Sequence, residues 1–357
     1  MTKLKDSKKL ETELIELSLP RGRKPGTAGH RDAEEWISEK MENAGLQPYS
    51  GNSFRMPFSV GGENFVNFAG VIKGRFHSKP PLLIGAHYDS VIESYCADDN
   101  AAAVVIALAA GEYFASNYKR ELCRDIIIAI FDSEEPPYFL SEKMGSRYFF
   151  YNQMDKRKVH TALIMDLVGH SVPAGGIMKV AESSSAVSSA ESSSEFSKAE
   201  ERIENLLFVT GAESSGVFPD IFNDFPESQQ LNIVNVNTSI LEKDLSDYSV
   251  FRTNDYPFLF LTCGRWEHYH KETDTPDKLN YEKMQYILKY LVDLILRIMP
   301  ADHNKEAGDT LDLEISSFKN AFSFMLEPLL NTFKLKNLKD RKQLETVLEG
   351  LKRTGLV

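Results

Sequence analysis

Histidine and carboxylate side chains gather in five short segments of this 357-residue chain, at the ends of predicted strands. The segments are GAHYDS (85–90), CADDN (96–100), FDSEE (131–135), MDLVGH (165–170) and EHYHKETDT (267–275). The side chains of residues two apart on a strand point to the same face, so those of His87 and Asp89 lie on one face of their predicted strand. Asp89 could then hold one ring nitrogen of His87 and leave the other for a metal, or the two could simply satisfy each other near the surface.

Three other segments also allow a structural and a functional explanation. Asp98 and Asp99 precede an Ala-rich helix, where one of them would suffice as a cap, and two adjacent carboxylates repel each other unless a cation shares them. Glu134 and Glu135 follow the most hydrophobic strand and form either a solvated loop or part of a site. Asp166 interrupts an apolar strand, where an unpaired charge is costly, so it needs a partner or a metal.

The last segment contains His268 and His270, which could both be ligands or one ligand and one bystander. Taken together, the five segments offer histidine, aspartate and glutamate without cysteine as ligands. This mixture suits Zn²⁺, or Mn²⁺ and Co²⁺ in vitro, in a catalytic site better than an iron–sulfur cluster or a structural zinc site.

The elements that must position these residues alternate along the chain. Hydrophobic spacing predicts helices over 6–18, 31–44, 99–118, 144–153 and 281–298. Short apolar runs predict strands over 65–72, 81–86, 125–131, 162–167 and 256–261. Strands that alternate with helices indicate an α/β sheet with helices on both faces, and such folds place their chemistry in loops at the carboxyl ends of the strands.

Composition excludes several classes of partner. Lysine and arginine number 41 against 52 aspartate and glutamate, a formal net charge of −11, which argues against nucleic acid. The three cysteines, Cys96, Cys123 and Cys263, form no CxxC pair, which is typical of a reducing compartment. The first 20 residues lack the apolar core of a signal peptide, and no apolar run approaches the roughly 20 residues that span a bilayer. We therefore expect a cytoplasmic protein without a membrane partner.

Two regions depart from the alternating pattern. Residues 182–200 are rich in serine and predict a flexible surface insertion. Residues 301–357 predict a helical C-terminal extension, packed on the main domain or on another subunit, which leaves a homo-oligomer open. The catalytic domain is accordingly expected over residues 1–300.

The order of the motifs is specific. GAHYDS, DDNAAA, FDSEEP, GSRYF, MDLVG and YHKETDTPDKL follow one another as in the metallopeptidase family that contains the bacterial di-zinc leucyl aminopeptidases and, as relatives, the glutaminyl cyclases. The chain resembles this family from about residue 28 to about residue 296. The resemblance implies a three-layer α/β/α fold with a mixed, mostly parallel central sheet, and a zinc-dependent aminopeptidase that binds two Zn²⁺ and takes peptides as substrates.

The resemblance also implies a role for each motif residue. His87 and Asp166 would bind the first metal, and Glu135 and His270 the second. Asp98 would bridge both metals, and Asp99 would follow it across a peptide bond that is often cis in the family.

Two further acids would assist catalysis. Asp89 would hold His87. Glu134 would be the general base: it would take a proton from the water that becomes the metal-bridging hydroxide and pass that proton to the leaving amine. An aromatic pocket would suit a hydrophobic first residue of the substrate. The candidates for its lining are Tyr138, Phe139, Trp266 and Tyr269.

Some positions depart from the family pattern. Ala101–Ala103 replaces the usual small-small-Gly, and 136–139 is longer and more aromatic than in the simple aminopeptidases. Gly145-Ser146-Arg147 resembles the glutaminyl cyclases, which work with a single zinc, whereas Tyr269 stands where those enzymes commonly have tryptophan. We expect an aminopeptidase, with a glutaminyl cyclase-like acyltransferase as the alternative and a non-catalytic binding protein as a third reading.

Overall fold

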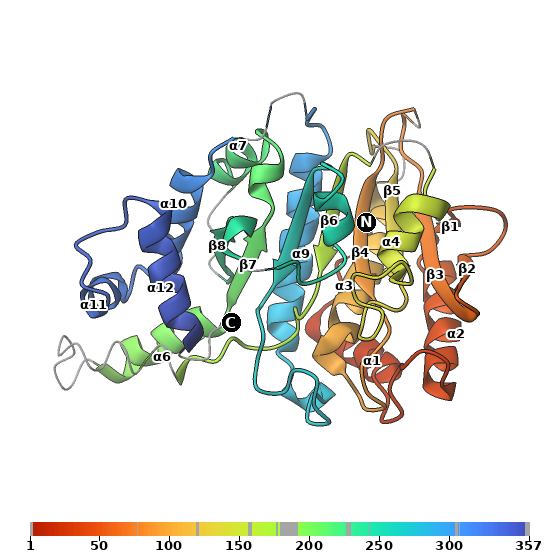
Figure 1. The fold of residues 1–357 in the computed structure, drawn as a ribbon, viewed down its shortest axis with the longest axis horizontal. Helices are drawn as coiled ribbons and strands as arrows, with labels where there is room; N and C mark the ends of the chain where they lie inside the picture. The colour runs from red at the N-terminus through yellow and green to blue at the C-terminus, as the bar shows by residue number, and fades with distance from the viewer. Residues whose placement is uncertain are drawn as a thin grey trace.

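The structure, a computed structural model, describes residues 3–76, 78–118, 121–155, 159–175, 178, 192–225, 230–241, 243–303, 306 and 308–353. Its centre is a mixed sheet, which in the described residues has nine strands in the order β1-β3-β5-β4-β6-β9-β7-β8, with β2 paired to β3 (Figure 1). The strands are β1 (Gln47–Pro48), β2 (Arg55–Val60), β3 (Glu63–Ile72), β4 (Leu82–His87), β5 (Ile126–Phe131), β6 (Thr161–Met165), β7 (Leu206–Thr210), β8 (Asn232–Val236) and β9 (Phe258–Thr262).

The middle of the sheet is parallel and its flanks contain antiparallel pairs. β5, β4, β6 and β9 run in the same direction, while β3 is antiparallel to β5 and β7 is antiparallel to β9. Because the parallel strands share one direction, the loops that follow β4, β5 and β6 leave the sheet at one edge. Those loops carry three of the five predicted segments.

Alternating side chains of the strands build two hydrophobic cores, one on each face. In β5, Ile126, Ile128 and Ile130 belong to one core, and Ile127, Ala129 and Phe131 belong to the other. A strand that is buried on both faces has a continuous apolar sequence, and the apolar run of β5 predicted this burial.

Helices cover both faces and so complete the three layers. The larger core is closed by α1 (Ser7–Leu17), α2 (Ala28–Asn43), α3 (Ala102–Asn117) and α9 (Tyr281–Ile298). The opposite face is covered by α4 (Gly145–Tyr148), the helical turn Phe149–Gln153 and α8 (Ser249–Arg252). Figure 1 shows α3 and α9 on one side of the strands and α4 on the other. The predicted α/β fold is thereby confirmed.

The C-terminal helices extend the far end of the sheet, beyond β8 (Figure 1). They are α10 (Leu311–Ala321), α11 (Leu326–Thr332) and α12 (Arg341–Arg353). Ser317 of α10 accepts a hydrogen bond at Oγ from the backbone N–H of Asn235 in β8, at 2.9 Å. Phe318, Val347 and Leu351 are fully buried in the larger core, so these helices pack on the main sheet.

Two predicted elements differ from the structure. The helix predicted over 99–118 begins at Ala102, because Asp99 and Asn100 have non-helical backbone angles. Of the Ser-rich insertion, residues 182–191 lie outside the described residues, and the chain from Ser192 forms α6 (Ser192–Glu204). Another short helix in the described part of this region is α7 (Phe218–Asn223). Within the described ranges, every helix is too short or too polar to cross a membrane.

Candidate metal centre

Three neighbouring parallel strands bring the predicted residues together. His87 is the last residue of β4 and lies beside Phe131, the last residue of β5. Asp166 follows the end of β6 directly, and Glu134 and Glu135 stand in the loop that leaves β5. The shared direction of these strands therefore places their terminal side chains at one edge of the sheet, where the loops with Asp99 and His270 meet them.

Two groups of possible ligands form there and share one carboxylate. The first consists of His87, Asp99 and Asp166, and the second of Asp99, Glu135 and His270; within each, the ligand atoms lie within 4.8 Å of one another. Asp99 stands between the groups, with Oδ1 3.4 Å from Nε2 of His87 and Oδ2 3.2 Å from Nε2 of His270. Oε2 of Glu135 is 3.1 Å from Nε2 of His270.

The donor atoms of both groups fit metal ions. Five of them are buried and close to one another but have no hydrogen-bond partner among the residues described: His87 Nε2, Asp99 Oδ2, Glu135 Oε1, Asp166 Oδ1 and His270 Nε2. Buried polar atoms without a partner are costly, and native proteins seldom keep them. A cation in each group would satisfy them all, and the mixture of imidazole and carboxylate is one that zinc accepts.

Asp98, the predicted bridging ligand, does not join this group. Its Oδ1 accepts a hydrogen bond from the backbone N–H of Gly169 at 2.6 Å, and its Oδ2 lies 2.6 Å from Nδ1 of His170. The prediction is thus displaced by one residue, because Asp99 occupies the place expected of Asp98. The cis peptide bond, too, follows Asp99, between Asp99 and Asn100.

The physical reason lies in Asp274, which holds the backbone of this segment. Its two carboxylate oxygens accept the N–H groups of Asp98 and Asp99, at 2.9 and 3.1 Å. With both amides fixed, the two adjacent side chains go to different partners, Asp98 to His170 and Asp99 to the ligand groups.

Asp89 makes the same kind of contact on the other side of the centre. Its Oδ1 accepts the N–H of Glu134 at 2.9 Å and its Oδ2 accepts the N–H of Glu135 at 3.0 Å. Oδ1 also lies 3.3 Å from Nδ1 of His87. Asp89 is fully buried and therefore ties the loop after β5 to the histidine at the end of β4.

Burial and crowding shift the pKa values of the group. Burial lowers the pKa of His270, but Asp99 and Glu135 outweigh it and raise this pKa to about 10. Burial and the charge of Asp99 raise the pKa of Glu135 to about 8. Burial also raises the pKa of Glu134 well above its usual value, although His87 opposes the shift. The centre therefore retains protons that bound cations would displace.

Several residues of the site carry no motif that sequence reasoning used. Arg23 is almost fully buried and donates from its guanidinium to the carbonyl oxygens of Tyr88, Tyr95 and Cys96, at 2.7, 2.8 and 2.7 Å. It thereby joins the loop after β4 to the segment that precedes Asp99. A lone arginine in a loop gives no signal in the sequence.

Asp247 was missed as well. It is fully buried, and neither carboxylate oxygen has a hydrogen-bond partner in the described part of the chain. Burial raises its pKa to about 7, while the charge of His87 lowers it. In the sequence, Asp247 lies in LSDYSV (245–250), a segment with no predicted element and no motif, so it gave no signal there.

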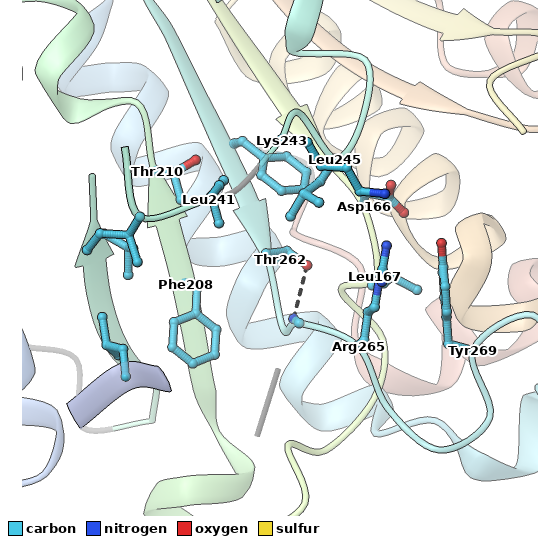
Figure 2. A pocket seen from close by; sticks show the side chains of 15 residues that line it. Asp166, Leu167, Phe208, Thr210, Leu241, Lys243, Leu245, Thr262, Arg265 and Tyr269 are labelled. Carbon is cyan, nitrogen blue, oxygen red and sulfur yellow. Dashed lines mark hydrogen bonds between the residues drawn. The ribbon is translucent and has the colours of Figure 1, made fainter. Parts of the chain in front are cut away.

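A cavity of about 230 Å³ opens beside the centre and shares Asp166 with it (Figure 2). Of the four aromatic residues predicted to line a pocket, Tyr269 lines this one, together with Phe208 and Phe260. Trp266 instead stacks on His170, with ring centroids 4.6 Å apart.

Known proteins share this architecture. The LapA aminopeptidase of Legionella pneumophila superposes with a TM-score of 0.62 at 16% identity, covering 83% of this chain and 72% of that one. A Zn-dependent exopeptidase from Parabacteroides distasonis gives 0.58 at 13% identity, covering 84% and 100%. Porphyromonas gingivalis glutaminyl cyclase gives 0.54 at 15% identity, covering 82% and 99%. At these identities the likeness establishes the fold alone.

Sequence comparison identifies the family. The uncharacterized protein YfbL of Escherichia coli (strain K12) is 26% identical over 230 residues, which cover 60% of this chain and 66% of that protein. The model of peptidase family M28 matches residues 67–295, more than half of the chain, from within β3 to within α9, and this range includes both ligand groups. The resemblance inferred from the motifs is thereby confirmed: this chain belongs to peptidase family M28.

Proposed function

We propose that this chain is a zinc-dependent aminopeptidase that hydrolyses the first peptide bond of its substrates. The observation that carries the proposal is the position of Asp99, whose two oxygens face His87 on one side and His270 on the other, at 3.4 and 3.2 Å. A carboxylate shared by two ligand groups is what a pair of metal ions requires. The Zn-dependent exopeptidase from Parabacteroides distasonis, which has the same fold, supports the choice of metal.

The chain's own residues would divide the work. His87 and Asp166 would hold one zinc, Glu135 and His270 the other, and Asp99 would bridge them. Bound zinc supplies a water of lowered pKa and polarises the scissile carbonyl. Asp89 keeps His87 and the loop with Glu135 in register through its three contacts.

Glu134 is placed to move the proton. Its Oε2 lies 3.8 Å from Nε2 of His87, its backbone N–H is held by Asp89, and its side chain is almost fully buried. A raised pKa brings a carboxylate closer to the pH at which it can both accept a proton from water and return it to the leaving amine. The surrounding carboxylates would hold the free α-amine of the peptide, which limits cleavage to the first residue.

A glutaminyl cyclase-like acyltransferase with a single zinc is the second candidate. Its support is the common fold, since a glutaminyl cyclase covers 82% of this chain with a TM-score of 0.54. Such an enzyme needs one metal, whereas this chain offers two ligand groups with Asp99 in common. That difference favours the hydrolase.

Metal content and product together test the proposal. The purified protein is loaded with Zn²⁺, dialysed and analysed, and then assayed with leucyl and other aminoacyl peptides and with peptides that begin with glutamine. We expect about two zinc ions per chain and release of the free first amino acid. One zinc per chain with a cyclised N-terminal glutamine as product would establish the second candidate instead.

A further inference from the structure

The cavity beside the metal centre, called here the side pocket, combines an apolar wall with two cations. Its volume is about 230 Å³, and Leu241, Leu245, Phe260 and Leu348 are among its apolar lining residues. Arg265 and Lys243 also line it. Leu348 comes from α12, so the C-terminal helices form part of its wall.

Arg265 is oriented but unpaired. Its guanidinium lies over the ring of Tyr269, 4.8 Å from the centroid. Figure 2 shows the two side chains running side by side toward the part of the pocket where Asp166 lies. Tyr269 is the neighbour of the proposed ligand His270, so this stacked pair stands where a substrate would pass from the metals into the pocket.

Only some arginines in the described part of the chain have an acidic partner. Acids outnumber bases by 52 to 41, and some arginines pair with them, as the exposed Arg252 does with Asp244 at 2.6 Å and the half-buried Arg341 does with Glu314 at 2.9 Å. Among the described residues, neither Arg265 nor Lys243 makes a hydrogen bond or an ion pair. Both side chains are exposed and therefore available to a ligand.

Charge complementarity then defines the ligand. Asp166, the acid that the pocket shares with the centre, would be occupied by a metal ion. Arg265 and Lys243 would then be the charged side chains left along a largely apolar lining, and they attract an incoming anion. A planar guanidinium stacked on an aromatic ring matches a carboxylate in particular, because it offers two parallel N–H donors.

Resting on the proposed aminopeptidase function, we infer that the side pocket binds a substrate carboxylate and that Arg265 is the residue that selects for it. The carboxylate comes from one of two sources. It is either the acidic side chain of the first residue or the C-terminal carboxylate of a short peptide, and the apolar wall receives the carbon chain that carries it.

Two pairs of peptides separate these sources. Glu-Leu-amide against Gln-Leu-amide tests the side chain, and Leu-Leu against Leu-Leu-amide tests the C-terminus. For one of the two pairs, we expect the kcat/KM of the zinc-loaded enzyme to be about 10- to 100-fold higher for the peptide with the carboxylate. This factor corresponds to the free energy of a charge-assisted hydrogen bond. Arg265→Gln should bring that ratio close to one, Arg265→Lys should keep part of it, and the distant control Arg31→Gln should keep all of it.

The outcomes separate this inference from the function on which it rests. Hydrolysis with equal rates within both pairs, or a preference that survives Arg265→Gln, overturns the inference and leaves the aminopeptidase intact. Failure to hydrolyse any of the four peptides overturns the proposed function. Calorimetric titration of the same peptides into the zinc-loaded Glu134→Gln variant measures the preference without turnover, and equal affinities within both pairs there also overturn the inference.

Discussion

Oδ2 of Asp98 lies 2.6 Å from Nδ1 of His170, while the adjacent Asp99 joins the ligand groups around His87 and His270. The two neighbouring aspartates thus have different structural roles. Asp98 fastens its segment to the loop after β6, where it also accepts the N–H of Gly169. Asp99 supplies the carboxylate that the two ligand groups share.

Substituting these two aspartates separates their roles. Asp99→Asn removes the shared carboxylate and should lower zinc affinity by at least about 100-fold, more than the loss of an outer partner, because both ligand groups depend on it. Asp98→Asn leaves both groups complete and should lower it by less than about 10-fold. Zinc content after dialysis measures the difference, and the reverse order of the two variants would return the bridging role to Asp98.

Asp89→Asn tests the contact between the loop after β5 and His87. The amide retains one acceptor oxygen in place of the two that now hold the N–H groups of Glu134 and Glu135. We expect zinc affinity or kcat/KM to fall by about 10- to 100-fold, as for other partners that orient metal ligands. Asp277→Asn, an exposed aspartate, is the control. Equal values for the two variants would deny Asp89 this role.

Glu134→Gln tests the proton transfer. The variant keeps the shape of the side chain but cannot accept the proton, so kcat should fall by about 10²- to 10⁴-fold while zinc content stays unchanged. Glu135→Gln is the matched comparison, because loss of that ligand should remove zinc as well. An unchanged kcat in the Glu134→Gln variant would refute the assignment of Glu134 as the general base.

A chain of hydrogen bonds far from the metal ligands predicts loss of stability in acid. Oγ1 of Thr161 lies 3.1 Å from Nδ1 of His160 and 2.8 Å from Nε2 of His303, and Ser215 Oγ lies 2.7 Å from Nδ1 of His303. Burial, with Arg124 nearby, lowers the pKa of His160 to about 3 and of His303 to about 4.

Both pKa values lie below the value of about 6.5 for an unfolded histidine. Between pH 6.5 and about 4 the unfolded chain therefore binds more protons, and the free energy of unfolding falls as the pH falls. His303→Gln should destabilise the protein at pH 7 and do so less at pH 4.5, as measured by urea unfolding. Thr161→Val should cost about 1–3 kcal/mol at pH 7, against little for the exposed control Thr12→Val. A His303→Gln effect independent of pH would refute the assignment.

Metal binding should raise thermal stability. The ligand atoms without hydrogen bonds are already assembled, so Zn²⁺ binds the folded chain in preference to the unfolded one. Zinc at 100 times its Kd contributes about 2.7 kcal/mol, which for a chain of this length raises Tm by roughly 3–4 °C. Excess chelator should reverse the shift, and Asp99→Asn should abolish it. An unchanged Tm on zinc addition in the unsubstituted protein would argue against the centre.

Much of the sheet was readable from local pattern. The run DIIIAIF predicted a strand buried on both faces, and β5 divides its side chains between the two cores as expected. The strands β1, β2, β7 and β8 were not predicted. β7 and β8 pair with each other in parallel across more than 20 intervening residues, and β7 also pairs with β9, so neither five-residue segment contains a local pattern that identifies its partner.

The positions of the ligand motifs followed from the sequence for the same reason. His87 and Asp166 stand at the ends of recognisable parallel strands, and the strand direction alone brings them to one edge. Lys243, Arg265 and Leu348, by contrast, meet in the side pocket from three distant parts of the chain. Their proximity depends on how the loops and α12 pack, which no local pattern encodes.

By itself, then, the sequence determined the family, the α/β fold and the short segments from which the centre is built. Only the tertiary structure decided which of the two adjacent aspartates joins the centre. Asp274, more than 170 residues away, holds both of their N–H groups, and His170 takes the carboxylate of Asp98, so Asp99 is the one left to face His87 and His270. The sequence pattern does not distinguish two adjacent aspartates, but a fixed backbone directs their side chains to different partners.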